Sequence, residues 1–245
     1  MKWTIFNKML VAFGIIALFL VAMAAENWIA MTNSINETEI ARDRDYAGAE
    51  LAQNVKLDVL QVWQWLTDIS ATRAAEGFDD GFAEAEANAV LFREHLATLK
   101  ALQPDHAAEL TALGESFEEF YTKGQWMAQQ YIDGGPELGN LAMSEFDAYA
   151  ADLNTKLDAF VAEMYDEAHM SIDDAIAHSN STRRLGLILA VVAVLSAVGI
   201  AYFMSSSMSK DLRQMVKAAH GIAQGNIDQE IRIKRQDEIG ELAGA

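Results

Sequence analysis

The sequence predicts an all-α fold in which two transmembrane helices bracket an antiparallel four-helix bundle, followed by an incomplete helix–connector–helix segment. Residues 185–204 form an apolar run without a charge, and apolar residues recur at alternating spacings of three and four from residue 55 to residue 168. Such spacings place apolar side chains on one helical face. The 245 residues include only 2 prolines, which favours long helices.

Two stretches are long and apolar enough to cross a membrane. Residues 185–204 would form a helix about 30 Å long, the thickness of a hydrocarbon core. Residues 9–31 follow Lys2 and Lys8 and give the other transmembrane helix. A cleaved signal peptide is the alternative for this stretch, because residues 22–24 form an A-x-A site. We expect a retained helix, because helical sequence continues past that site.

Positive charges predict the orientation of the chain in the lipid bilayer. Lys2 and Lys8 precede the first apolar run, and Lys210, Arg213 and Lys217 follow the second. Cytoplasmic segments carry an excess of Lys and Arg. We therefore expect both of these segments in the cytoplasm and residues 32–182 on the opposite side of the membrane.

Residues 32–182 predict four amphipathic helices separated by short breaks. The breaks are GFDDG at residues 77–81, QPD at residues 103–105 and DGGP at residues 133–136. Four such helices describe an antiparallel bundle. Its predicted core residues are Val55, Val59, Val62, Leu66, Ile69, Phe82, Ala85, Ala89, Phe92, Leu96, Leu99, Leu110, Leu113, Phe117, Phe120, Gly124, Met127, Tyr131, Ala142, Phe146, Tyr149, Leu153, Leu157, Phe160, Met164 and Ala168.

The first and last of these helices are longer than the middle two. Outside the membrane they run about 45 residues, or nearly 70 Å, whereas the middle pair runs about 25 to 28 residues, or about 40 Å. The middle pair can therefore cover only the membrane-distal part of the outer pair. We expect a homodimer, because a second copy would cover the flanks left exposed nearer the membrane.

The charge and the residue usage exclude several classes of function. The net charge is −18, and residues 32–182 carry 29 Asp and Glu residues against 8 Lys and Arg residues. Such an acidic surface repels nucleic acid, so we expect no nucleic-acid partner. The absence of cysteine excludes disulfides, thiolate metal sites and haem attachment through CxxCH.

Catalytic and metal-binding patterns are also missing. The chain has no GxSxG or Walker motif, so we expect no enzyme, no catalytic residue and no cofactor. His95 and His106 flank one break, and His169 and His178 each follow an aspartate by one turn. The pattern of carboxylates and Glu-x-x-His pairs found in di-iron bundles is not seen. We expect these histidines on solvated faces and no metal site.

The first bundle helix carries a polar stripe beside its apolar face. Amides, carboxylates, an indole and a hydroxyl recur at spacings of three and four, and one arginine follows them. These are the groups that a small polar or cationic ligand needs. The alternative is a dimer contact or a solvated flank that binds nothing. The candidate ligand-binding residues are Asn54, Gln61, Trp65, Asp68, Thr72 and Arg73, with Asp58 in the same stripe.

The residues after the second apolar run form a coiled-coil seam, a connector and the start of another helix. Seam residues Leu212, Met215, Ala219 and Ile222 step by 3, 4 and 3. A glycine with aliphatic residues at offsets of two and six comes next, and then a DExG sequence. Together these features resemble a HAMP linker, with the signature residues Leu212, Gly225, Ile227, Ile231, Asp237, Glu238 and Gly240.

This segment departs from the HAMP pattern in one place. Such linkers often carry a proline just before the first seam leucine, and Asp211 stands there instead. The departure bears on how sharply the membrane helix bends where it enters the linker.

The complete order of elements resembles the N-terminal part of a methyl-accepting chemotaxis receptor. The resemblance implies a bacterial inner-membrane protein whose periplasmic domain senses a small molecule. It also implies that a cytoplasmic kinase and adaptor are reached only through an output domain, which residues 1–245 do not contain. The expected order is a cytoplasmic N-terminus (1–8), a first transmembrane helix (9–31), a periplasmic sensor bundle (32–182), a second transmembrane helix (185–204) and a truncated HAMP linker (205–245).

Two other functions fit the same arrangement. The chain could be a structural or interaction module that dimerises with full-length receptors or docks a periplasmic binding protein. It could also be the input half of a sensor histidine kinase or a cyclase. Family members that bind dicarboxylate amino acids through this helix use several arginines, so the single Arg73 argues against an acidic amino acid as ligand.

Overall fold

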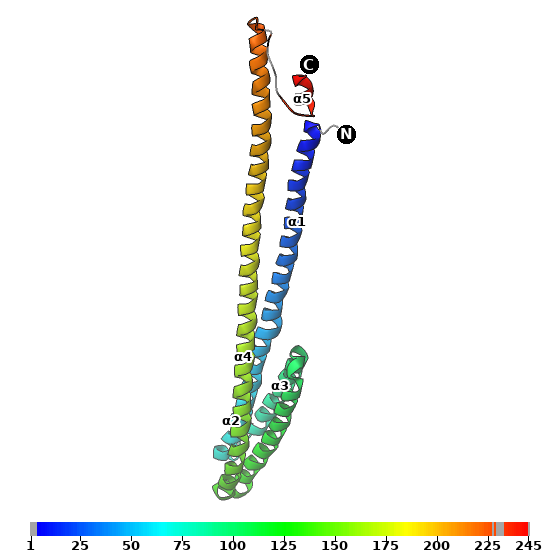
Figure 1. The fold of residues 1–245 in the computed structure, drawn as a ribbon. Coiled ribbons are helices and arrows are strands. Elements are labelled where there is room, and N and C mark those ends of the chain that lie inside the picture. Colours follow the sequence, from blue (N-terminus) through cyan, green and yellow to red (C-terminus); the bar gives the residue numbers. More distant parts are fainter. Residues whose placement is uncertain (1–3, 227, 229–232, 245) are drawn as a thin grey trace. The chain divides into compact units, whose positions relative to one another are not determined.

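The computed structural model describes residues 4–226, 228 and 233–244, which form helices joined by short turns (Figure 1). These residues contain no strand, and the predicted all-α class is confirmed. The chain divides into two compact units, Ser34–Ala177 and Met1–Asn33 with His178–Ala245. The elements in order are α1 (Ile5–Ile40), the π-helix η1 (Ala41–Tyr46), α2 (Ala47–Thr72), α3 (Gly81–Leu102), the 3₁₀-helix η2 (Pro104–His106), α4 (Ala107–Ala223) and α5 (Glu238–Ala243).

The unit Ser34–Ala177 is a bundle built from α2, α3 and two parts of α4. A single non-helical residue, Gly135, divides α4, with φ of 59° and ψ of −154°. Glycine adopts a positive φ without the steric cost of a Cβ atom. Pro136 then begins the next helical part, where its fixed φ and missing N–H are tolerated. The predicted break at residues 133–136 is therefore confirmed.

The other two turns also fall at predicted breaks. Helix α2 is followed by its C-cap Arg73, which has a left-handed φ of 51° and donates its backbone N–H to the Ile69 carbonyl at 2.7 Å. Helix α3 is followed by its C-cap Gln103, and a short 3₁₀ turn then leads into α4. Three reversals of the chain thus bring four amphipathic segments around one core.

The apolar faces predicted from residue spacing form this core. The predicted core residues are buried, except Phe82 and Tyr149, which are partly buried. The rings of Phe92 and Phe117 stack with centroids 3.7 Å apart, and those of Phe120 and Phe146 lie 5.0 Å apart. These aromatic contacts join α3 to α4 and the two bundle segments of α4 to each other.

One local feature of the bundle was not predicted, the π-helix Ala41–Tyr46. π-Helices are rare, and they shift the register of the backbone carbonyls. Here the Gln103 side-chain amide donates a hydrogen bond of 2.9 Å to the Arg44 carbonyl. Gly48 leaves room for that amide, because a Cβ atom at this position would contact the Gln103 side chain. The C-terminal end of α3 is thereby fixed to the π-helix.

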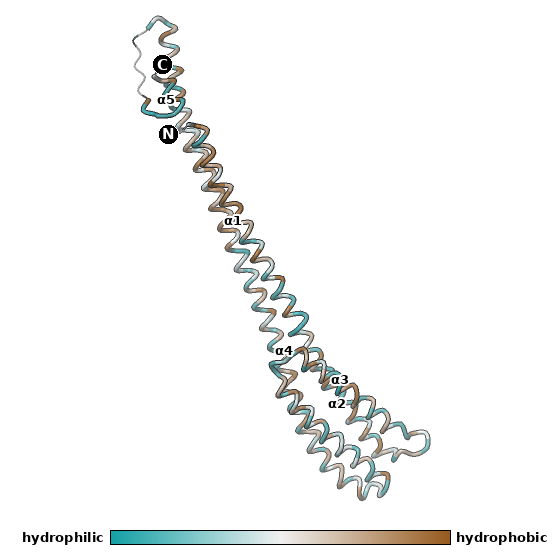
Figure 2. Tube along the Cα trace, turned by 90° about the vertical axis from the view of Figure 1, so that its right-hand side faces the viewer, coloured by the Kyte–Doolittle hydropathy of each residue, from teal (hydrophilic) through white to brown (hydrophobic). Residues whose placement is uncertain are grey.

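The other unit contains the apolar parts of α1 and α4 (Figure 2). In the described part of the chain, two helices, Ile5–Thr72 and Pro104–Ala223, are long and apolar enough to cross a membrane by length and composition. The predicted transmembrane segments at residues 9–31 and 185–204 lie within these helices, and their boundaries stay predictions. After α4, the turn at Gly225 has φ of 89°.

The core predicts a contrast between two leucines of α4. We expect Leu157→Ala, at a fully buried site, to lower the free energy of unfolding by about 2 to 5 kcal/mol, because it removes packing and leaves a cavity. Leu141 is 74% exposed, and we expect Leu141→Ala to change this free energy by less than about 0.5 kcal/mol. Denaturant unfolding followed by circular dichroism measures both, and equal losses would contradict the assignment of the core.

Candidate functional site

The polar stripe of α2 contains both exposed and half-buried side chains. Trp65 packs partly against the bundle core. Gln61 and Asp68 lie four and three residues from Trp65, so an amide and a carboxylate flank the indole on one helical face. The exposed members are Gln61, Asp68 and Arg73, and the half-buried members are Asn54, Trp65 and Thr72.

Asp58 stands apart from the rest of the stripe because α3 covers it. Its side chain is buried, and Asp58 Oδ2 lies 2.7 Å from His95 Nδ1. Burial raises the pKa of the Asp58 carboxyl, although the hydrogen bond with His95 opposes this rise. Asp58 therefore takes part in a contact between helices, while the more exposed members remain available to solvent.

The distal end of the stripe lies next to the break in α4. A Cβ atom built on Gly135 would lie 3.3 Å from the Arg73 guanidinium, so this cation approaches the turn closely. Residues that are far apart in sequence thus meet at one end of the bundle. The sequence places Arg73 at the end of a helix, but it does not reveal this neighbour.

The histidines differ from the sequence expectation at one end of the bundle. The His106 side chain is only 14% exposed, and its Nε2 atom lies 3.1 Å from Glu167 Oε2. The prediction of a solvated face is therefore wrong for His106, while His169 and His178 are exposed. Within the described residues, no group of three or more His, Asp or Glu side chains is arranged to hold a metal ion.

A second candidate site lies in the other unit, at the DExG sequence. Asp237 precedes α5 and accepts a hydrogen bond of 3.4 Å from the Gly240 backbone N–H. A side chain at Gly240 would collide with the Arg235 backbone, which explains the glycine. Glu238 is the first residue of α5. Two further signature residues, Ile227 and Ile231, lie outside the described residues.

Asp237 is the centre of a network of ion pairs. Its carboxylate accepts from Lys8 Nζ at 2.5 Å and from Arg235 Nε at 2.9 Å, and its side chain has no exposed surface. Burial raises the pKa of Asp237, but the hydrogen bonds from Lys8, Arg235 and the Gly240 amide outweigh burial and lower it to about 2. The carboxylate is therefore charged at neutral pH.

Arg235 connects this network to α4. Its Nη1 atom donates to Asp211 Oδ2 at 2.5 Å and to Ser207 Oγ at 3.3 Å. Asp211 thus accepts a hydrogen bond from an arginine at the position where related linkers often carry a proline. Within the described part of α4, the non-helical residue is Gly135, so the helix continues through Asp211.

The coiled-coil seam of α4 is exposed on its apolar side. Leu212 is 45% exposed and Ile222 is 51% exposed, and Ala219 is exposed between them. The adjacent Ala218 is buried. The remaining seam residue, Met215, is half-buried, so most of the predicted seam is exposed in a single copy of the chain.

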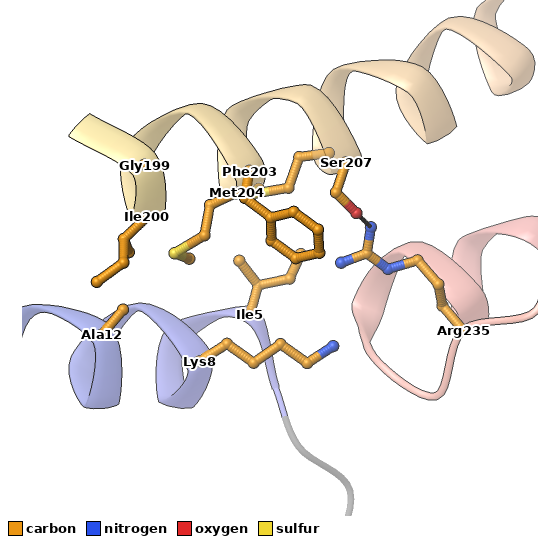
Figure 3. Close-up of a pocket in the computed structure, with 10 residues that line it drawn as sticks. Ile5, Lys8, Ala12, Gly199, Ile200, Phe203, Met204, Ser207 and Arg235 are labelled. Atoms are coloured by element: carbon orange, nitrogen blue, oxygen red, sulfur yellow. Dashed lines mark hydrogen bonds between the residues drawn. The ribbon is translucent and has the colours of Figure 1, made fainter. Parts of the chain in front are cut away.

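A cavity of about 630 Å³ lies beside the ion-pair network (Figure 3). The side chains of Lys8 and Arg235 lie at its polar end, but Asp211 and Asp237 neutralise these two cations. The charge therefore does not favour an anionic ligand. The remaining lining residues are Ile5, Ala12, Gly199, Ile200, Phe203, Met204, Ser207 and Met208.

Comparisons with known proteins agree with the geometry of this unit. Residues 203–245 match the model of the HAMP domain. A curated protein of Acetivibrio thermocellus that is named a sensory transducer protein is 27% identical over 137 residues, which cover 55% of this chain and 24% of the relative. The chain thus spans about a quarter of that relative's length. No solved structure gives a significant match.

These matches support a signal-transducing receptor input module. The family match confirms the HAMP linker that the seam, connector and DExG sequence predicted, and the relative supports a likeness to chemoreceptors. The ion-pair partners Lys8 and Arg235, and the hydrogen-bond acceptor Ser207, were not predicted as parts of the linker. The replacement of the usual proline by Asp211, with an arginine just before DExG, was a signal that could have identified the pair Asp211 and Arg235.

Proposed function

We propose that this chain is the input part of a bacterial chemoreceptor that senses a small molecule in the periplasm and controls chemotaxis through a cytoplasmic output. The course of α4 is the observation that carries the proposal. The helix has no non-helical residue from residue 136 to residue 223. One helix therefore includes the last bundle segment, the apolar run and the HAMP seam.

Charge supports the proposed topology. The lysines of residues 1–8 and the basic residues after residue 204 suit the cytoplasmic side, and the strongly acidic segment 32–182 suits the periplasm. A displacement of the last bundle segment along its axis would then reach the linker through the membrane. The linker would pass it to a cytoplasmic histidine kinase and its adaptor through an output domain.

The polar stripe is the proposed ligand site, with Gln61, Trp65 and Asp68 as its accessible centre. An exposed carboxylate beside an indole suits a small polar or cationic molecule, because both groups attract a cation. Arg73 and Thr72 lie at the distal end and would contact the uncharged or anionic part of the ligand. Asn54 lies at the other end of the stripe.

The exposed HAMP seam supports a homodimer. An apolar seam at spacings of three and four is stable in water when another helix covers it. The unequal helix lengths predicted for residues 32–182 give the same expectation. A second copy of the chain would cover both surfaces at once.

A thermal-shift screen of residues 32–182 tests the sensor role. We expect one class among amines, amino acids, organic acids and divalent metals to raise the melting temperature by a few degrees, since a hundredfold excess over Kd adds about 2.7 kcal/mol. Asp68→Asn should abolish the shift. The matched variant Asp147→Asn, at an exposed aspartate of α4, should retain it.

If the bundle is folded but no compound raises its melting temperature, an interaction module that docks a protein is favoured. Equal shifts in Asp68→Asn and Asp147→Asn would exclude the stripe as the ligand site while leaving the sensor role intact.

Disulfide cross-linking tests the homodimer. The chain has no cysteine, so Leu212→Cys and Ile222→Cys each introduce a single thiol. We expect both variants to form cross-linked dimers rapidly in membranes, because symmetric seam residues of a parallel pair face each other. Lys217→Cys, on the same helix but outside the seam, is the control and should react more slowly. Equal rates at all three positions would argue against a seam contact.

A further inference from the structure

The first turn of α1 makes two contacts with the start of α5. The Ile5 backbone N–H donates to Glu238 Oε2 at 2.7 Å. The first N–H groups of a helix have no partner within it, and a carboxylate there is favoured by the helix dipole. Glu238, part of the HAMP signature, therefore caps α1.

Lys8, three residues after Ile5, makes the second contact, with Asp237. Its ammonium is partly exposed, whereas the Asp237 carboxylate that it binds is completely buried. A buried carboxylate that loses one of its cations is left with unmet hydrogen-bonding capacity. Loss of Lys8 therefore costs more free energy than loss of one partner of an ion pair on an open surface.

Arg235 holds the same carboxylate from the side of α4. It donates to Asp237 and to Asp211 of α4. It also donates to Ser207 of α4, the bond drawn in Figure 3. Asp237 is consequently the group through which the first turn of α1 and the end of α4 are both attached to α5.

We propose that the first turn of α1 is a working part of the HAMP linker, with Lys8 as a positioning residue for the start of α5. In this arrangement a shift of α4 relative to α1 changes the position of α5. The proposed receptor function requires movement of α4 alone, so this inference goes beyond it. It also holds whichever stimulus the bundle binds.

The competing explanation is that Lys8 serves only as a positive charge that fixes membrane orientation. That role needs a cation on the cytoplasmic side, but it needs no contact with Asp237. Lys8→Met removes the contact, while Lys8→Arg retains a donor for the carboxylate. Lys217→Met removes an exposed cation of the same unit and is the matched control.

The experiment uses residues 1–245 in lipid nanodiscs. The orientation that the cell gives the protein on membrane insertion then does not affect the result. Hydrogen exchange reports on the Gly240 and Glu241 amides, which bond to Asp237. We expect Lys8→Met to speed this exchange about tenfold, as for one lost hydrogen bond to a charged group. Lys8→Arg and Lys217→Met should leave it unchanged.

An NMR titration of Asp237 gives a second readout that general loosening of the unit would not produce. The pKa of Asp237 is held at about 2. In Lys8→Met it should rise toward the ordinary value of about 3.9, since the charged form loses a cation. In an Asp237→Asn background, Lys8→Met should add no further effect on exchange.

Unchanged exchange and an unchanged Asp237 pKa in Lys8→Met would overturn the proposal. So would an equal acceleration of exchange in Lys217→Met, because the effect would then come from net charge. Neither result depends on a ligand, so neither bears on whether the bundle is a sensor.

Discussion

The alternation of apolar residues at spacings of three and four is the constraint on which this structure depends. In the unit Ser34–Ala177 each helix buries one such face, and the large side chains Phe92, Phe117 and Phe146 fill the space between them. The HAMP segment of α4 carries the same spacing, but there most of the face is exposed. One pattern thus gives a filled core in one unit and an apolar surface suited to a second copy in the other.

Polar contacts fix the positions of the helix ends, where apolar packing is less extensive. Gln103 joins α3 to the π-helix, His106 pairs with Glu167, and the ion pairs of Asp237 surround the start of α5. Surface ion pairs contribute little, whereas a buried carboxylate such as Asp237 requires its partners. Under the proposed receptor function these contacts position elements that the signal moves.

Residue spacing predicted the parts of the structure that depend on local sequence. The helical faces and the breaks at Gly135 and Gln103 follow from periodicity, glycine and proline, which act within a few residues. The contacts of His95 with Asp58 and of Lys8 with Asp237 were missed, because they join residues 37 and 229 positions apart. The π-helix was missed too, since a one-residue change of register leaves no distinctive composition. The stripe of α2 was found as a pattern, but the covering of Asp58 by α3 required the structure.

The central claim is that the chain crosses the membrane twice, with the bundle on the periplasmic side and the HAMP linker on the cytoplasmic side. The absence of cysteine permits a direct test with Leu141→Cys in the bundle and Lys217→Cys in the linker, both at exposed positions. Each variant is treated with a membrane-impermeant maleimide in intact and in permeabilised spheroplasts. The account predicts labelling of the residue-141 thiol in intact spheroplasts and of the residue-217 thiol only after permeabilisation. Labelling of both thiols, or of neither, in intact spheroplasts would contradict it.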